Sequence, residues 1–467
     1  MKPFNRRDFL KTASTVAASG LIHPLWANPS QYDVIVIGAG LSGLHAAYLL
    51  EQQGANVLVL EANNRVGGRV HTLDDMEGHP EAGANQVGLD YDVLRAISNR
   101  LNIKFEAGSD MMAPGMTFAI NQQLLGARAW GKHPANKLSP SERDFQPNWL
   151  LWHYLNQGET LAEPQQWLSP DFSHLDIPLA EHLKSLGASN EAMRLINSNF
   201  MANDISKVSA LQMLRKNAII KGALGAEFVQ GGTQRIPEAM AADLKQPPQL
   251  NKPVSQIKQQ GTQAVVTCQD GSSYTAKRCI VTTPFSTLRE MDLQLLISAP
   301  KRQAIKSMDY SRATHVFFKP KSEFWLEDEL SPNMWTDTPI GMVFSQQGPD
   351  KKVTMVRAWL AGNNAMAVDS LPSEQIGQQI LQAFEKARPS AAGKLEVSKV
   401  ISWQNNPFSR GAYAQYNAGD INRFAHAVPL VEGPLHFAGE HTEARKSGME
   451  AAVLSAERCA PEVINSI

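Results

Sequence analysis

A strand, a glycine-rich turn, a helix and a second strand follow one another near the start of the sequence, and this order constrains the fold more than any other feature. Residues 33–37 (DVIVI) and 56–60 (NVLVL) are apolar, β-branched runs with the length of buried parallel strands. Residues 44–53, which lie between them, have the composition of a helix. The segment therefore predicts a βαβ unit, the core of a parallel α/β sheet.

The turn of this unit reads G-x-G-x-x-G, with Gly38, Gly40 and Gly43 at the glycine positions. Gly38 permits the tight turn, Gly40 lets the backbone approach a pyrophosphate, and Gly43 lets the helix pack closely on the strand. The helix N-terminus offers free N–H groups to the phosphates. Glu61, at the end of the second strand, is placed to accept hydrogen bonds from a ribose. We expect a dinucleotide site here.

A second glycine turn follows Glu61 directly and reads Arg65-Val66-Gly67-Gly68-Arg69. With the preceding acid, it resembles the E-A-x-x-R-x-G-G-R pattern of the FAD-dependent amine oxidase family. The resemblance implies FAD as the cofactor, with Arg65, Gly68 and Arg69 among its contacts. A basic residue that the family often places two positions after the acid is Asn63 here, so one phosphate contact is expected to be missing.

Further stretches resemble the family in the same order along the chain. Residues 81–88 resemble the segment that runs beneath the flavin ring and begins the substrate cavity, and residues 231–237 resemble a glycine turn that re-enters the FAD domain. Val254 lies in a stretch like the strand that packs on adenine. Residues 438–442 and 447–453 resemble the C-terminal flavin motif.

The C-terminal motif also has a physical rationale. Residues 449–457 have helical composition, so Gly448 and Met449 should present backbone N–H groups at a helix N-terminus. At the N1/O2 edge of a flavin, such a terminus stabilises negative charge on the reduced ring. The resemblance assigns Gly439 and Glu440 to the cofactor as well, and Glu440 is expected to contact the ribityl or phosphate chain.

The resemblance implies an α/β fold in which a Rossmann-like FAD-binding domain is interleaved with an α+β substrate domain, a mixed sheet plus helices. We expect residues 32–88, 224–292 and 400–463 to form the FAD-binding domain. Residues 89–223, with a helical insert, and 293–399 are expected to form the substrate domain.

On the substrate side, Tyr413 stands at the position of one aromatic wall of the family's substrate cage, and Trp403 at that of a nearby tryptophan. Gly448 stands where relatives carry the second aromatic, so the cage is expected to be half open, to admit a larger substrate or to receive a wall from elsewhere. Ala412 occupies the place of a cysteine that attaches the flavin covalently in some relatives. Since alanine cannot form a thioether, the FAD is predicted to be noncovalent.

Two residues that differ from the family pattern bear on the reaction and on the substrate. His315 stands where many relatives have a lysine that holds a water near flavin N5, and a histidine that is neutral near pH 7 puts fast reaction with O₂ in doubt. The alternative is a strand histidine that satisfies a backbone partner. Gln86 occupies the place of an arginine that binds the substrate carboxylate in amino-acid oxidases, which favours an amine without an α-carboxylate, although Arg312 or Arg410 could supply the charge.

The N-terminus predicts export. Arg6-Arg7 precede a weakly apolar stretch rich in Ala, Ser and Thr, residues 12–25, in an order that resembles a twin-arginine signal. Residues 1–27 are the predicted signal, and the mature protein is expected in the periplasm with its cofactor already inserted. Either O₂ or a quinone or periplasmic redox protein would then accept the electrons.

The composition of the chain excludes several other classes of protein. A formal net charge of −1 lacks the basic excess of nucleic-acid binders. No run of about 18 apolar residues follows the N-terminus, so no membrane span is expected. The three cysteines, Cys268, Cys279 and Cys459, are too few and scattered for a zinc site or a disulfide framework, although Cys268 and Cys279 could approach each other. No metal is expected.

The resemblance implies the oxidation of a small-molecule amine to an imine by hydride transfer to flavin N5, with hydrolysis to an aldehyde afterwards. His315, Tyr413, Trp403 and Gln86 are the candidate catalytic residues. An L-amino-acid oxidase or other flavin desaturase is the first alternative, because it would have the same FAD-binding domain. A degenerate FAD-binding protein without amine oxidase activity is the second.

Overall fold

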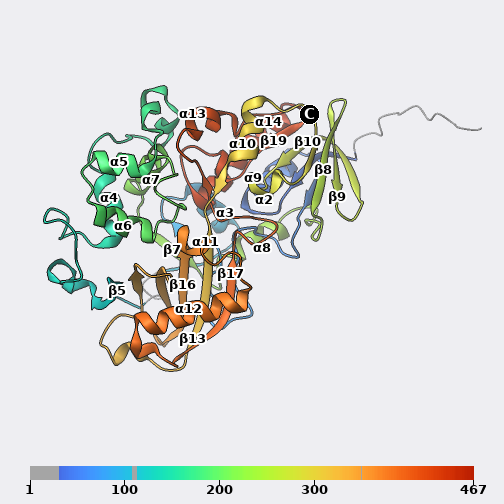
Figure 1. The fold of residues 1–467 in the computed structure, drawn as a ribbon. Coiled ribbons are helices and arrows are strands. Elements are labelled where there is room, and N and C mark those ends of the chain that lie inside the picture. The colour runs from blue at the N-terminus through green and yellow to red at the C-terminus, as the bar shows by residue number, and fades with distance from the viewer. Residues whose placement is uncertain (1–30, 108–112, 349) are drawn as a thin grey trace, which may run out of the picture.

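The computed structural model describes residues 31–107, 113–348 and 350–467, so the predicted signal at 1–27 lies outside the described part. Figure 1 shows three regions. A first sheet carries the N-terminal strands, a second sheet is covered by α12 (Ser373–Ala387), and a helical region contains α4 (Leu150–Leu155) to α7 (Ala210–Lys221). No helix among the described residues is long and apolar enough to cross a membrane.

The first sheet is built around β1 (Tyr32–Ile37), which lies between two parallel neighbours, β2 (Val57–Leu60) and β10 (Ser273–Val281). A further parallel strand, β19 (Leu435–Phe437), pairs with β10. Three distant parts of the chain thus supply adjacent parallel strands. The antiparallel pair β8 (Val254–Gln260) and β9 (Gln263–Cys268) extends the sheet, and β11 (Asp292–Gln294) forms its edge.

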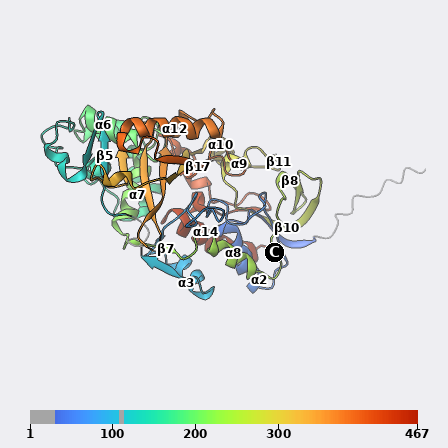
Figure 2. The same ribbon diagram turned by 90° about the horizontal axis from the view of Figure 1, so that it is seen from below.

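Strand β1 separates two apolar layers because its side chains alternate between the faces of the sheet. Val34 and Val36 pack in the cluster beneath the helices, whereas Ile35 and Ile37 belong to a cluster that continues into the helical region. The covering helices lie together in Figure 2: α2 (Leu41–Gln52), α3 (Asp92–Arg100), α8 (Arg235–Ala242) and α14 (Gly448–Ile464).

Helix α3 corrects a predicted boundary. The segment 89–223 was assigned to the substrate domain, but Leu94 and Ile97 pack in the same apolar cluster as α2 and α14. The buried carboxylate of Glu450, in α14, also accepts the backbone N–H groups of Val93 and Leu94, each at 3.0 Å. Helix α3 therefore belongs with the FAD-binding region.

The second sheet has the strand order β17-β13-β16-β15-β14-β5-β6. All its neighbours are antiparallel except β14 and β5, so the sheet is mixed, as expected. Its strands are β5 (Thr117–Ile120), β6 (Gln123–Gly126), β13 (Ala313–Pro320), β14 (Met334–Thr336), β15 (Met342–Gln347), β16 (Val353–Ala361) and β17 (Leu395–Ser402).

The remaining elements are short. The helical region also holds α5 (Leu179–Ser185) and α6 (Asn190–Ser198), and the other α-helices are α9 (Phe285–Leu288), α10 (Ala299–Ser307), α11 (Asn363–Met366) and α13 (Asp420–Phe424). Two small sheets pair β3 (Val87–Gly88) and β4 (Phe105–Ala107) with β7 (Ala226–Val229), and β12 (Asp309–Tyr310) with β18 (Ala414–Gln415). The 3₁₀ turns are 127–132, 147–149, 164–168, 170–175, 324–326, 389–391, 425–427 and 440–442.

Candidate active site

The glycine motif forms one wall of a cavity at the carboxyl end of β1. Gly38 has a φ of +108°, and a Cβ there would lie 2.6 Å from Thr282 Oγ1. A Cβ at Gly43 would lie 1.9 Å from the carbonyl oxygen of Gly38, so only glycine lets α2 close on the strand. Gly40 is different, because its Cβ would meet nothing closer than 3.9 Å and would project into space at the cavity wall.

Glu61 is buried at the end of β2 and also lines the cavity. Its Oε2 accepts the N–H of Ala39 from the glycine turn at 2.8 Å, and its Oε1 accepts the N–H and the Nδ2 of Asn63, each at 2.8 Å. These bonds hold the carboxylate beside the helix N-terminus, where the predicted ribose contact requires it. Asn63 thus acts on Glu61 itself.

Arg65 and Gly68 shape the second glycine turn. The guanidinium of Arg65 donates to the carbonyl oxygens of Gly68 at 2.8 Å, Val70 at 2.9 Å and Val66 at 3.1 Å. Burial lowers the pKa of Arg65. Arg65 was predicted to contact the cofactor. It lines the cavity, but its shorter hydrogen bonds go to the turn and a longer one, of 3.4 Å, to Gln234 Oε1, so we assign it a positioning role.

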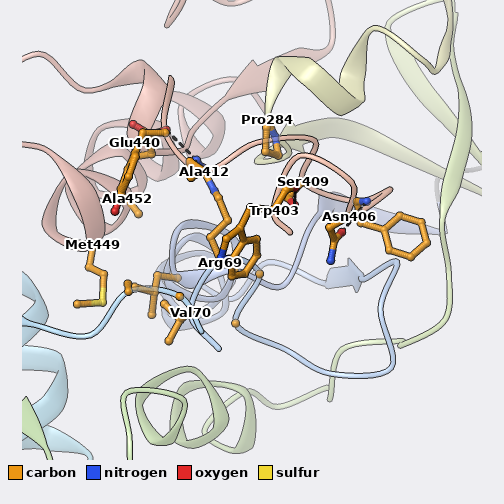
Figure 3. A pocket seen from close by; sticks show the side chains of 18 of the residues that line it. Arg69, Val70, Pro284, Trp403, Asn406, Ser409, Ala412, Glu440, Met449 and Ala452 are labelled. Carbon is orange, nitrogen blue, oxygen red and sulfur yellow. Dashed lines mark hydrogen bonds and ion pairs between the residues drawn. The ribbon is translucent and has the colours of Figure 1, made fainter. Parts of the chain in front are cut away.

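Arg69 leaves the same turn and crosses to the C-terminal motif (Figure 3). Its Nη1 donates to Glu440 Oε1 at 2.9 Å and to the carbonyl oxygen of Ala412 at 2.6 Å. Glu440 Oε1 also accepts the N–H of Ala414 at 3.0 Å. Burial opposes ionisation of Glu440, but the neighbouring guanidinium and this N–H outweigh it and lower its pKa. Gly439, Gly448 and Met449 line the cavity beside this ion pair.

The second sheet supplies the opposite wall. His315 on β13 pairs with Trp359 on β16, and their rings stack with centroids 5.6 Å apart. Both line the cavity, together with Tyr413 and Trp403. Trp403 Nε1 donates to the carbonyl oxygen of Ala82 at 2.7 Å, which fixes its ring. Tyr413 is 39% exposed and its ring is available to a bound molecule.

The environment of His315 determines its charge. The side chain is buried, and its Nδ1 has no hydrogen-bond partner among the described residues. Burial, followed by the positive charge of Arg357, holds the pKa of His315 well below its usual value. His315 is therefore neutral at physiological pH, and mild acidification does not charge it.

Two predicted site residues lie elsewhere. Gln86 is exposed and does not line the cavity, whereas its neighbour Asn85 does, so the Gln86 side chain is not part of this wall. Val254 is buried at the start of β8 and does not line the cavity. The loop before it, however, lies beside the ribose acid, because Lys252 donates its N–H to the carbonyl oxygen of Glu61 at 2.8 Å.

Sequence reasoning missed three residues at or near the site. Arg357 and Trp359 line the cavity from β16. Tyr91 lies behind Gly448, its hydroxyl 3.6 Å from the position that a Cβ of Gly448 would take. The side of the cage that Gly448 leaves open is therefore backed by an aromatic from another element. The largely apolar sequence of β16 indicates a buried strand but does not show which of its residues face a ligand.

The lining fits a flavin dinucleotide. The glycine turns, Glu61 and the N-terminus of α14 line one continuous cavity with the aromatic wall. Four buried polar atoms on lining residues have no partner among the described residues: Thr283 Oγ1, His315 Nδ1, Arg357 Nε and Trp359 Nε1. Buried polar groups are normally hydrogen-bonded, so these atoms indicate a polar ligand.

None of the three cysteines lines this cavity, and all are free and buried. Cys268 and Cys279 do not pair. A cysteine thioether to the flavin is therefore excluded, which supports the prediction of noncovalent FAD. Elsewhere, His436, Cys459 and Glu462 bring possible metal-ligand atoms within 4.8 Å of one another, but the Glu462 carboxylate is already ion-paired with Arg458 at 3.1 Å.

Comparison with known proteins gives a consistent result. The family model described as flavin containing amine oxidoreductase matches residues 41–464. An L-amino-acid oxidase of Siganus canaliculatus is 26% identical over 92% of this chain and 85% of its own length. The flavin-containing amine oxidase A of Equus caballus is 24% identical over 93% of this chain and 85% of its own. Cyclohexylamine oxidase from Brevibacterium oxydans shares the fold, with a TM-score of 0.77 at 22% identity over 94% of this chain and 99% of its own.

Proposed function

The chain belongs to the flavin containing amine oxidoreductase family, so it is an FAD-dependent enzyme that acts on the CH–NH bond of amines, and we propose how its site does so. In the proposed reaction, the α-carbon of an amine loses a hydride and its nitrogen loses a proton, which leaves an imine. Water then hydrolyses the imine to a carbonyl compound and ammonia or a smaller amine. FAD supplies the two-electron acceptor for the hydride.

The observation that carries this proposal is the juxtaposition of the dinucleotide wall and the aromatic wall in one cavity. Gly40 and Glu61 lie on one side, and His315, Trp359 and Tyr413 lie on the other. The aromatic rings give an amine a flat, apolar binding surface that excludes water from the reacting carbon. The N-terminus of α14, which begins at Gly448, provides N–H groups for negative charge.

Protonation sets a condition on the substrate. A protonated amine cannot release a hydride readily, so the amine must be neutral when it reacts. The low pKa of His315 keeps this imidazole uncharged and avoids electrostatic repulsion of an arriving ammonium group, although it gives no strong base. We therefore infer that the ammonium group gives up its proton to solvent water as desolvation lowers its pKa on entry, so that the neutral amine reaches the reacting centre.

The electron acceptor and the location are part of the proposal. A neutral His315 offers a dipole rather than a charge to a reacting O₂, which supports slow oxidation by O₂ and a quinone or periplasmic redox protein as the alternative acceptor. The Arg6-Arg7 pair supports export through the twin-arginine route. Fractionation of cells that express the full chain, compared with an Arg6→Lys/Arg7→Lys variant, tests this: the variant should remain in the cytoplasm.

The reaction is tested by anaerobic mixing of the holoenzyme with amines, amino acids and polyenes while the flavin absorbance is followed. Bleaching by compounds that carry a CH–NH bond, with one carbonyl product formed for each flavin, supports amine oxidation. Bleaching by polyenes alone would make the protein a desaturase and overturn the proposal. This design identifies the substrate class without assuming any electron acceptor.

A further inference from the structure

The cavity described above adjoins a second cavity of about 430 Å³, and only Asn85 and Arg357 among the described residues line both. The second cavity lies against β15, β16 and the segment around Glu81. Arg357 is thus the one charged side chain at the junction of the two cavities. Neither the family's cofactor motifs nor the proposed reaction gives it a role.

Arg357 is 8% exposed, and one edge of its guanidinium group has no hydrogen-bond partner among the described residues. Its Nη1 donates to the carbonyl oxygen of Glu81 at 2.7 Å, a neutral acceptor. Its Nε is buried without a partner, and Nη2 makes no hydrogen bond to a described residue. The Nε and Nη2 groups together form a parallel pair of donors that can bind the two oxygens of a carboxylate.

Arg388, an arginine with a purely structural role, has the counter-charge that Arg357 lacks. The side chain of Arg388 is 0% exposed, and it makes two bonds with Asp328, from Nε to Oδ2 at 2.9 Å and from Nη2 to Oδ1 at 2.7 Å. A buried charge is costly unless it is paired. Arg357 has no carboxylate within ion-pair distance among the described residues, so its missing counter-charge points to a ligand.

The neighbouring acidic residues do not supply a counter-charge to Arg357. Glu81 is the closest in its electrostatic effect, but its Oε2 accepts Thr72 Oγ1 at 2.9 Å and its Oε1 accepts the N–H of Thr233 at 2.5 Å. Burial lowers the pKa of Arg357 to about 10, and Glu81 partly opposes this, so the guanidinium stays charged at neutral pH. Glu106 also lines the second cavity and makes no ion pair with Arg357.

Register places Arg357 within reach of the reacting centre. Trp359 is paired with His315, and Arg357 is paired with Phe317, two residues further along each strand. Alternate residues share a face, so Arg357 and Trp359 project to the same side, about 6.6 Å apart along the strand. An amine lying on His315 and Trp359 can therefore extend an acidic group to Arg357.

We propose that Arg357 binds an anionic group of the substrate, so that the preferred substrates are amines that also carry a carboxylate or a similar oxyanion. This inference rests on the proposed amine oxidation. It replaces the expectation of an amine without a carboxylate, which depended on Gln86. Arg312 and Arg410 do not compete for the role, because they pair with Asp369 at 3.2 Å and Glu290 at 3.0 Å and line neither cavity.

The test compares amino acids with the amines that share their side chains, in anaerobic stopped-flow reduction of the flavin. The wild type should be reduced about 10²-fold more efficiently by the acid than by its amine, an advantage of about 2.7 kcal/mol. Arg357→Gln should lose that preference, so that the acid and its amine reduce the flavin with similar efficiency. Arg357→Lys should retain part of it, since it keeps the charge but not the paired donors. Arg312→Gln is the matched control and should retain the full preference.

A second measurement does not depend on turnover. Benzoate and benzamide have the same shape but differ in charge, and their binding to the oxidised holoenzyme can be followed through the flavin spectrum. Benzoate should bind the wild type and Arg312→Gln more tightly than benzamide, and Arg357→Gln should lose the difference. Equal reduction by acid and amine, unchanged in Arg357→Gln, would overturn this inference and leave amine oxidation standing. Selective benzoate binding without reduction of the flavin by any amine would support the anion site at Arg357 and overturn amine oxidation.

Discussion

Arg69 and Glu440 lie 371 positions apart in the sequence, and Arg69 Nη1 lies 2.9 Å from Glu440 Oε1. The ion pair joins the second glycine turn to the C-terminal motif, and the carbonyl oxygen of Ala412 shares the same guanidinium. Two of the segments expected to hold FAD are therefore fixed to each other by one partly buried charge pair. This link explains how a cofactor site can be assembled from parts at opposite ends of the chain.

Replacement of Arg69 by Gln should destabilise the protein and weaken FAD binding. Glu440 would remain partly buried with its counter-charge removed, which costs about 3 kcal/mol. Urea unfolding of the apoprotein measures this loss, and the Arg410→Gln variant, whose pair with Glu290 is about half exposed on both sides, should lose less than about 1 kcal/mol. Equal losses in the two variants would show that the Arg69 pair has no special role.

Replacement of Gly40 by Val should abolish FAD binding without unfolding the protein. The backbone at Gly40 has φ −78°, which any residue adopts, and the nearest atom to a Cβ would be 3.9 Å away, so the added side chain projects into the space expected for phosphate. Flavin content after purification measures the effect. Gly222→Val, at the exposed end of α7, is the control and should retain full flavin. Full occupancy in Gly40→Val would contradict the assignment of the glycine turn.

Acid precipitation should release the flavin into the supernatant. Ala412 cannot form a thioether, and none of the cysteines lines the cavity. The measurement is the absorbance of the supernatant and of the washed pellet after denaturation. Yellow colour that stays with the pellet would show a covalent link through a residue other than cysteine.

Reoxidation of the reduced enzyme by O₂ should be independent of pH between about 6 and 8 as far as His315 is concerned. Burial and the charge of Arg357 hold the pKa of this histidine well below 6.5 in the folded protein. The unfolded chain takes up a proton below pH 6.5 and the folded chain does not, so His315 lowers stability only as the pH falls below that value. A rate that rises on acidification near pH 6.5, and that His315→Gln abolishes, would contradict this account.

The local elements near the cofactor were predictable because their periodicity is strong. The strands at 33–37 and 56–60 and the helix that follows the glycine turn occur where the pattern placed them. Helix α2 begins earlier than expected, at Leu41, directly after its extended N-cap residue Gly40. Helix α14 continues beyond the expected end at 457 to Ile464.

The site residues outside the motifs were not predictable in the same way. Gln86 lies in an irregular segment before β3, where no period fixes the direction of a side chain. Arg357 faces the cavity only because β16 pairs with β13 in one register, which depends on residues 40 positions away. Tyr91 approaches Gly448 through the packing of α3 on α14. Each of these placements is a consequence of long-range contacts.

The most direct test of the account is the rate of anaerobic flavin reduction by the best substrate and by its α-deuterated form. Transfer of hydride from the α-carbon predicts that the holoenzyme is bleached by the amine and that deuteration slows the bleaching. The carbonyl product should appear in equal amount to the flavin reduced. A flavin that stays oxidised with every amine and amino acid, or one whose bleaching is the same with both isotopes, would contradict the proposed reaction.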